Sequence, residues 1–416
     1  MQRYSEYKDS GVKWLGEIPS HWEVKRLASF FTERRVKVSD KDYEPLSVTK
    51  QGVFPQLDNV AKTNDGDNRK LVKEGDFVIN SRSDRKGSSG VADRDGSVSL
   101  INIVLKPRKT ILAKYSNYLL KSYKFIEEYY RNGRGIVADL WTTRFDEMKM
   151  IKLAIPTLEE QETIATYLDE ATSKIDAAIA QQQRMIELLN ERKQIIINNA
   201  VTKGLDPNVK MKDSGIEWIG EIPEHWEVRR FKTIAKVKSN LVHPKDYLHY
   251  PQISPDCIEK DSGVLLNYCT VQDSGIISDN HLFYEGQIVY SKIRPTLNKV
   301  IIAPFNGLCS ADMYPIETTI ERIFLQYIML SDFFSEQVQI VVNERVKMPK
   351  INKEELGNII IVLPPNEEQR KIAEHLTYRV EQIYKSILHY RNLISFLQEH
   401  KQIIINDVVT GKVKVI

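Results

Sequence analysis

Two cationic loops carry the side chains best suited to binding chemistry in this sequence. Residues 80–90 (NSRSDRKGSSG) are polar, basic and glycine-containing, and they follow a predicted strand; residues 291–299 (SKIRPTLNK) lie at the matching place in the second half. Lysine and arginine neutralise phosphates, while arginine, lysine, asparagine and glutamine hydrogen-bond to base edges. The matched position favours a binding role over the alternative, two solvated loops that happen to be charged.

A second basic set precedes the strand that leads into each of two long helical segments. It consists of Arg131, Arg134, Arg144, Arg345, Lys347 and Lys350. Basic residues near helix ends also complement the helix dipole, so this set has a structural alternative.

No catalytic motif accompanies these cations. The sequence has no N/D-P-P-Y/F motif of adenine methyltransferases, no Walker A loop and no GxGxxG. Pro364-Pro365-Asn366 has the wrong residue order, and residues 255–260 (PDCIEK) lack the Glu-x-Lys spacing of a nuclease. The basic loops are therefore not accompanied by any of these catalytic motifs.

The elements that must position the loops include two long helices, predicted over residues 159–200 and 367–408. The segments align without a gap at an offset of 208 (367 − 159), and seven apolar positions are identical, spaced by 4, 7, 4, 7, 3 and 7 residues. This is a one-sided stripe close to a heptad. A rod of about 60 Å with one apolar seam needs a partner, and the other copy is the obvious one. The predicted coiled-coil seam comprises Ile164, Leu168, Ile175, Ile179, Ile186, Leu189, Ile196, Ile372, Leu376, Ile383, Ile387, Ile394, Leu397 and Ile404.

The repeat extends beyond the helices. Residues 8–27 (KDSGVKWLGEIPSHWEVKRL) and 212–231 (KDSGIEWIGEIPEHWEVRRF) share 14 of 20 residues. The paired tryptophans, Trp14 with Trp218 and Trp22 with Trp226, are expected to anchor these arms by packing. A period near 200 residues is too long for a solenoid, so the chain is a tandem duplication of one unit.

Between arm and helix the two halves diverge, and each is expected to be a mixed α/β (α+β) globule. Short strands are predicted at 98–105, 299–303 and 359–363, and helices at 114–131 and 320–341. Two antiparallel helices would place these globules at opposite ends, related by a pseudo-twofold axis. Such a molecule suits two separated sites on one DNA duplex.

Composition sets broad limits. The chain has 416 residues, is 42% hydrophobic and carries a net charge of +3. The N-terminus lacks the apolar core of a signal peptide, and no apolar run reaches the roughly 18 residues of a membrane span. The three cysteines form no CxxC pair, so neither a disulfide nor a metal site is expected. A cytoplasmic location is expected.

The repeated segments resemble those of the specificity subunits of type I restriction–modification systems. The residues that carry the resemblance are KDSG-x-x-W-x-G-x-IP-x-HWEV and IP/LPP…EEQ-x-x-IA…KQIIIN, each present twice. The resemblance implies two target recognition domains that each read one half of a split DNA sequence, and an antiparallel coiled coil that sets the half-site spacing. It also implies two methylation subunits with S-adenosylmethionine, and restriction subunits with ATP and Mg. This chain is then expected to bind no cofactor and to have no catalytic activity, and the missing motifs agree with that implication. The expected divisions are 1–156 (arm and first domain), 157–204 (helix), 205–364 (arm and second domain) and 365–416 (helix and tail).

Under this resemblance the basic loops become candidate DNA contacts. The candidates are Asn80, Ser81, Arg82, Arg85, Lys86, Arg134, Arg144, Ser291, Lys292, Arg294, Asn298, Lys299, Arg345, Lys347 and Lys350. A specificity polypeptide of a related system outside type I is the alternative, and a coiled-coil adaptor that binds no DNA is a further one.

The duplication also makes a prediction about the chain ends. Residues 408–412 (VVTGK) resemble residues 200–204 (AVTKG), which lead into the second arm. By symmetry the C-terminal tail should lie near the first arm at residues 8–11.

Overall fold

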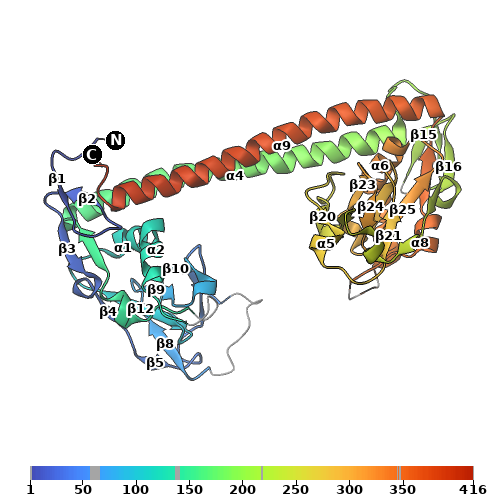
Figure 1. Cartoon of the computed structure of the whole chain (residues 1–416). Coiled ribbons are helices and arrows are strands. Elements are labelled where there is room, and N and C mark those ends of the chain that lie inside the picture. Colours follow the sequence, from blue (N-terminus) through green and yellow to red (C-terminus); the bar gives the residue numbers. More distant parts are fainter. Residues whose placement is uncertain are drawn as a thin grey trace. The chain divides into compact units, whose positions relative to one another are not determined.

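The computed structural model describes residues 2–56, 66–135, 141–216, 219–343, 345 and 348–415. The chain forms two compact units: unit 1 is Met1–Gln183 with Arg391–Ile416, and unit 2 is Arg184–Tyr390. Two helices, α4 (Leu158–Lys203) and α9 (Asn366–Val409), belong to both units (Figure 1). Each unit therefore holds the start of one long helix and the end of the other.

The apolar stripe of each long helix is turned away from solvent. All fourteen predicted seam residues are buried or half-buried, and Ile164 and Leu376 are fully buried. Within unit 1, Ile164 shares a core with Val408, and Lys401 Nζ lies 2.6 Å from a carboxylate oxygen of Asp176. The two helices therefore run antiparallel there. One continuous seam of all fourteen residues stays a prediction.

Each unit is a mixed α/β globule around one four-stranded antiparallel sheet. The strand order is β10-β9-β12-β4 in unit 1 and β23-β22-β25-β17 in unit 2, so the same sheet occurs twice. Alternate side chains of β9 enter different cores: Phe77 and Ile79 pack with the helices, while Val78 packs with Val98 and Val104 on the other face. This period-two pattern explains why a short, wholly apolar run forms a strand here.

The elements of unit 1 begin with a run of short strands, and two helices that cover the sheet come after them (Figure 1). They are β1 (Tyr7–Asp9), β2 (Glu17–Pro19), β3 (Glu23–Arg26), β4 (Phe31–Glu33), β5 (Lys37–Val38), β6 (Leu46–Val48), β7 (Val53–Pro55), β8 (Arg69–Val72), β9 (Phe77–Asn80), β10 (Ser89–Val91), β11 (Gly96–Val98), β12 (Asn102–Pro107), α1 (Ala113–Lys121), α2 (Tyr123–Arg131), α3 (Phe145–Met148) and β13 (Lys152–Ile155).

Unit 2 repeats this plan. Its second sheet has five strands, in the order β18-β21-β24-β19-β20, whereas the corresponding sheet of unit 1 has three, in the order β11-β8-β5. Its elements are β14 (Met211–Asp213), β15 (Glu221–Pro223), β16 (Glu227–Arg230), β17 (Ala235–Val237), β18 (Leu241–Val242), β19 (Pro251–Ile253), β20 (Cys269–Thr270), α5 (Val271–Ser274), β21 (Asn280–Phe283), β22 (Ile288–Ser291), β23 (Val300–Ile302), β24 (Gly307–Cys309), β25 (Met313–Thr318), α6 (Arg322–Leu330), α7 (Asp332–Val342), α8 (Lys353–Asn358) and β26 (Ile360–Leu363).

Three elements that were predicted to be continuous are each interrupted in the structure, so these predictions are wrong in that respect. The helix expected over 114–131 is broken at Ser122, and the helix expected over 320–341 is broken at Ser331. Each serine side chain accepts a hydrogen bond from a backbone N–H of the next helix, which starts that helix afresh. The strand expected over 98–105 is two strands, β11 and β12, because residues 99–101 form the turn between them.

The arms pack against the strand before each long helix. β1 pairs with β2 and β3 with β13 in unit 1, while β14 pairs with β15 and β16 with β26 in unit 2. Trp22 and Trp226 are fully buried, and Trp14 is half-buried; Trp218 lies outside the described residues. The divisions at residues 156, 204 and 364 stay predictions.

The C-terminal tail lies beside the N-terminal residues in unit 1 (Figure 1), with its contacts at residues 2 and 7, just before the predicted residues 8–11. The backbone N–H of Lys414 donates to the carbonyl of Gln2 at 2.8 Å, and Tyr7 Oη donates to the carbonyl of Lys412 at 3.0 Å. Among the described helices none is both long and apolar enough to cross a membrane. The described residues also contain no group of three or more His, Cys, Asp or Glu able to hold a metal ion.

Candidate nucleic-acid interface

The two basic stretches of unit 1 lie side by side, although they are far apart in sequence. Arg82 forms a β-bridge with Thr142, and Thr142 forms a second one with Arg134. The reciprocal backbone hydrogen bonds between Arg134 and Thr142 are both 2.9 Å, and Ser83 N donates to Trp141 O at 3.1 Å. The loop after β9 and the segment before α3 therefore form one surface.

Unit 2 joins its two basic stretches in the same way. Ile293 forms a β-bridge with Lys350. Arg294 N donates to Pro349 O at 2.8 Å, and Ile351 N donates to Lys292 O at 3.0 Å. The duplicated junction supports the two loops as functional units, because it recurs where the sequences differ.

A pocket of about 580 Å³ opens on this surface in unit 1. Its charged lining comes from Glu33, Arg35, Lys70, Arg82, Arg144 and Asp146. Leu100 and Ile101, at the tip of the β11–β12 turn, add exposed aliphatic side chains to the rim. A concave surface with guanidinium groups and apolar contacts suits both phosphates and base edges.

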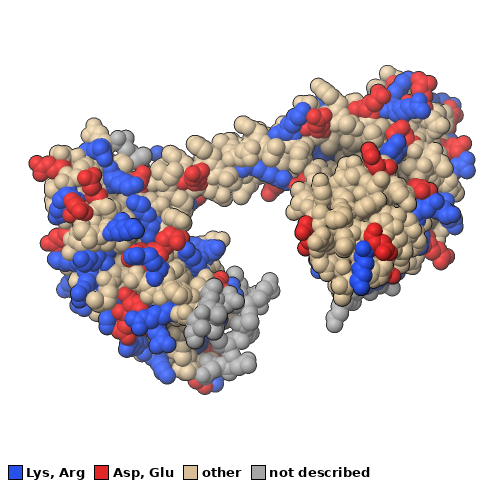
Figure 2. All heavy atoms as spheres, viewed as in Figure 1, with Lys and Arg blue, Asp and Glu red and all other residues tan. Residues whose placement is uncertain are grey.

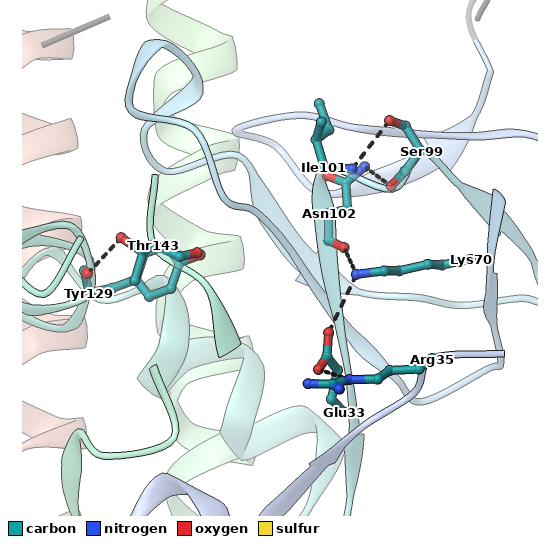
Figure 3. A network of polar contacts seen from close by, with 8 residues as sticks. All are labelled: Glu33, Arg35, Lys70, Ser99, Ile101, Asn102, Tyr129 and Thr143. Atoms are coloured by element: carbon teal, nitrogen blue, oxygen red, sulfur yellow. Dashed lines mark hydrogen bonds and ion pairs between the residues drawn. The ribbon is translucent and has the colours of Figure 1, made fainter. Parts of the chain in front are cut away.

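One side of this pocket is held by an internal ion-pair network (Figure 3). Lys70 Nζ donates to the carbonyl of Asn102 at 2.7 Å and lies 3.4 Å from Glu33 Oε1. Glu33 also accepts a hydrogen bond from Arg35 Nε, which raises the pKa of the Arg35 guanidinium. These contacts hold the Lys70 side chain in place as part of the pocket wall.

Two predicted contacts in unit 1, Asn80 and Ser81, are buried. Asn80 Oδ1 accepts a hydrogen bond from Arg82 N at 3.0 Å, while Ser81 bonds through its backbone to Ile101 and Thr143. The Asn80 side chain therefore shapes the loop, while Ser81 is part of the lining of the pocket. Asparagine after a strand is a frequent turn former, which is the signal that favours this role.

The other candidates of unit 1 are exposed, and four of them have a carboxylate nearby. Arg82 and Arg85 lie 3.5 Å and 3.8 Å from Asp84, and Lys86 lies 2.6 Å from Glu127. Arg134 lies 3.4 Å from Glu147, and Arg144 is exposed on the pocket rim. Figure 2 shows the same mixture, with lysine and arginine spread among carboxylates on the visible face of unit 1. Such surface pairs are weak and exchange readily for phosphate.

In unit 2 three candidates point inward. Ser291 and Asn298 are buried, and Lys299 Nζ donates to the carbonyl of Pro255 at 2.7 Å. Arg294 and Asn298 both have left-handed backbone conformations, with φ of 43° and 44°, and they flank Pro295 in a tight turn. Such conformations cost energy outside glycine and are retained where the turn itself matters.

The remaining candidates of unit 2 lie nearer the surface. Burial lowers the pKa of Lys292, and the charges of Lys350 and Lys353 lower it further while Asp312 opposes this. Lys350 Nζ lies 2.9 Å from Asp312 Oδ1. Arg294 is exposed, Arg345 is paired with Glu355, and Lys347 lies outside the described residues.

Arg35 and Lys70 line the pocket of unit 1, and sequence reasoning missed them. Arg34, the neighbour of Arg35, turns the other way and forms an internal ion pair with Asp76 at 2.6 Å. Both arginines lie between the end of β4 at Glu33 and the start of β5 at Lys37, so no strand or helix period in the sequence separates them.

A duplicated globule, with two sequence-distant basic stretches joined on each copy, defines a two-domain nucleic-acid-recognition protein. The family model of the type I restriction modification DNA specificity domain matches residues 19–188 and 223–389. The two matches cover most of the chain and one falls on each half, so the chain belongs to this family.

Two known proteins and one solved structure that are similar to this chain agree with this family membership. The chain is 32% identical to the type I restriction enzyme EcoDI specificity subunit of Escherichia coli over 62% of this chain and 60% of that protein. It is 26% identical to the MjaVIII specificity subunit of Methanocaldococcus jannaschii over 100% of this chain and 98% of that protein. A solved chain from work on assembly and conformational transition of the type I R-M system shares the fold, with a TM-score of 0.69, 15% identity, and coverage of 95% of this chain and 99% of that one.

Proposed function

We propose that this chain is the DNA-sequence-recognition subunit of a type I restriction–modification complex. Each globular domain reads one half of a bipartite asymmetric target, and the helix pair sets the spacing between the halves. The observation that carries the proposal is the joined basic surface, formed at Arg82 and Thr142 in one unit and at Ile293 and Lys350 in the other. Family membership favours this role over an adaptor or a system outside type I.

The chemistry belongs to partner subunits in this proposal. Two methylation subunits supply S-adenosylmethionine and methylate adenine, and restriction subunits supply ATP-driven cleavage with Mg. This chain positions them and holds no cofactor. These assignments rest on the family and on the absence of catalytic motifs from the sequence.

The outer faces of the long helices support a docking role. In unit 2, Met185, Leu188 and Ile195 are exposed, and their spacings of 3 and 7 residues place them on one helical face. Tyr378 and Leu388 of α9 are exposed as well. Exposed apolar residues on a helix are typical of a protein interface, and the methylation subunits are the proposed partners.

Methylome sequencing tests the proposal. A host that carries this chain with its genomic neighbours is compared with a host from which this chain alone is deleted. The expected result is loss of methyladenine from one split, asymmetric motif in the deletion strain. Unchanged methylation, in a host shown to express active methylation subunits, would contradict the proposal.

A further inference from the structure

Each recognition domain is attached to the long helices by a buried glutamine. Gln161, in the first turns of α4, is fully buried, and its Oε1 accepts a hydrogen bond from the backbone N–H of Leu112 at 2.9 Å. Its Nε2 donates to the carbonyls of Thr110 and Pro156 at 3.2 and 3.1 Å. Leu112 is the residue before α1, so the glutamine binds the start of a domain helix.

The second copy repeats this contact with different neighbours. Gln369, at the start of α9, is also buried, and its Oε1 accepts a hydrogen bond from the backbone N–H of Glu321 at 3.0 Å. Its Nε2 donates to the carbonyl of Pro364 at 2.8 Å. Glu321 is the residue before α6, which corresponds to α1.

A repeated asparagine makes a matching contact from the far end of the other long helix. Asn406 of α9 accepts a hydrogen bond from Lys124 N, in the first turn of α2, at 3.3 Å. Asn198 of α4 accepts one from Asp332 N, at the start of α7, at 2.9 Å, and its Nδ2 donates to Asp332 Oδ2 at 2.8 Å. Each domain is thus held at two points, by the start of one long helix and the end of the other.

In unit 1 a tyrosine adds a third contact between the points. Tyr118 of α1 donates to Asp169 of α4 at 2.6 Å. These polar contacts and a shared apolar core leave a domain little freedom to rotate about its helix pair.

We propose that Gln161 and Asn406 in unit 1, with Gln369 and Asn198 in unit 2, are positioning residues that restrict the complex to one spacer length. This inference rests on the proposed function. One base pair more or less shifts a half-site by about 3.4 Å and rotates it by about 35°, since a duplex turn spans about 10 base pairs and 34 Å. A domain fixed at two points does not follow that shift, whereas a loosened domain does.

The test measures methyl transfer by the purified complex of this chain with its methylation subunits. The substrates are duplexes that carry the methylated motif with its native spacer, or with one base pair added or removed. The readout is the ratio of the initial rates on native and altered spacers. In the double variant Gln161→Ala with Asn406→Ala, this ratio should fall about tenfold, which corresponds to about 1.4 kcal/mol of discrimination.

Two further variants separate positioning from stability. Asn406→Asp keeps the oxygen that accepts from Lys124 N, so it should retain wild-type discrimination when paired with native Gln161. Ser122→Ala removes a buried helix cap inside the same domain, without touching a long helix, and should lower stability with the ratio unchanged. Should the double variant fail to assemble, Asn406→Ala alone is measured against Asn406→Asp.

An unchanged ratio in the double variant, or in Asn406→Ala alone if the double variant does not assemble, would overturn the inference. An equal fall of the rate ratio in the Ser122→Ala variant would also overturn the inference. These outcomes differ from failure of the proposed function, in which the wild-type complex itself methylates no bipartite motif.

Discussion

Arg82 and Arg144 line one pocket although they come from separate stretches of unit 1, and both are exposed. We expect Arg82→Ala with Arg144→Ala to weaken binding of target duplex by the complex. If both side chains contact phosphate, the slope of log affinity against log salt should fall by about 2. If either reads a base, the methylated motif should relax at one position of one half only. Binding across a salt series, followed by motif sequencing, distinguishes the two.

Arg94→Ala is the matched control for this prediction. Arg94 is exposed in the same domain and pairs with Asp93, but it does not line the pocket. Equal salt slopes for the control and the double variant would remove the pocket from the interface.

We expect His281 to make the stability of unit 2 depend on pH. It is buried in β21, and its Nδ1 has no hydrogen-bond partner among the described residues. Burial lowers its pKa, and the nearby charges of Lys292 and Lys353 act in the same direction. The unfolded chain therefore binds the proton more readily, so stability should fall as the pH drops through about 6.5.

Thermal unfolding of the full chain between pH 7.5 and 5.5 measures this effect. We expect the melting temperature to fall with pH, and His281→Asn to flatten the change because the titrating group is gone. A variant with the same pH dependence as the wild type would show that other groups are responsible.

At the scale of the element, Glu160 and Glu368 explain why the arm and the helix start are repeated together. Glu160 accepts hydrogen bonds from Trp22 Nε1 at 3.2 Å and from Tyr4 Oη at 2.5 Å, and it pairs with His21 at 2.9 Å. In unit 2, His225 and Trp226 make the corresponding contacts to Glu368, at 2.8 and 3.1 Å. The carboxylate joins the arm to the long helix.

This contact predicts that replacing the glutamate by glutamine lowers the free energy of unfolding by different amounts in the two units. Glu160→Gln should lower the free energy of unfolding by about 1–3 kcal/mol, because a neutral amide accepts these hydrogen bonds less strongly. Glu368→Gln should cost less, since unit 2 lacks the contact that Tyr4 makes. Denaturant unfolding of the two variants measures the difference, and an equal or reversed order would contradict this account.

Periodicity in the sequence was enough to predict the long helices, and the internal repeat was enough to identify the arms. It did not predict the breaks at Ser122 and Ser331, because an apolar helical pattern continues across each serine and only the cap divides it. The sequence also did not predict which groups of the domain and the arm form hydrogen bonds with Glu160 and Gln161, since these groups lie far away in sequence. For the same reason the sequence suggested Asn80 as a DNA contact, whereas the fold turns it inward.

At the scale of the whole molecule, the bridge between Gln2 and Lys414 makes the chain nearly closed. A circular permutant that joins the natural ends and opens the chain near residues 206–208 should fold and assemble. The new ends fall in an exposed connection, where termini are well tolerated. Co-purification with methylation subunits tests this, and a folded permutant that binds no partner would contradict the symmetry argument.

Exchange of residues 28–139 tests the division of labour between the domains. We expect a chain with these residues from another family member to methylate a motif that is changed in one half only. Methylome sequencing reads the result, and a change in both halves would show that the domains do not read independently.

The four attachment hydrogen bonds share a chemical property with a wider consequence. In every case the long helix binds a backbone N–H of the domain, namely that of Leu112, Glu321, Lys124 or Asp332. Every residue except proline supplies this group, whatever its side chain. Recognition domains can therefore accumulate substitutions and acquire new targets while these four hydrogen bonds stay the same. The additional side-chain contacts of Tyr118 and Asp332 do depend on residue type.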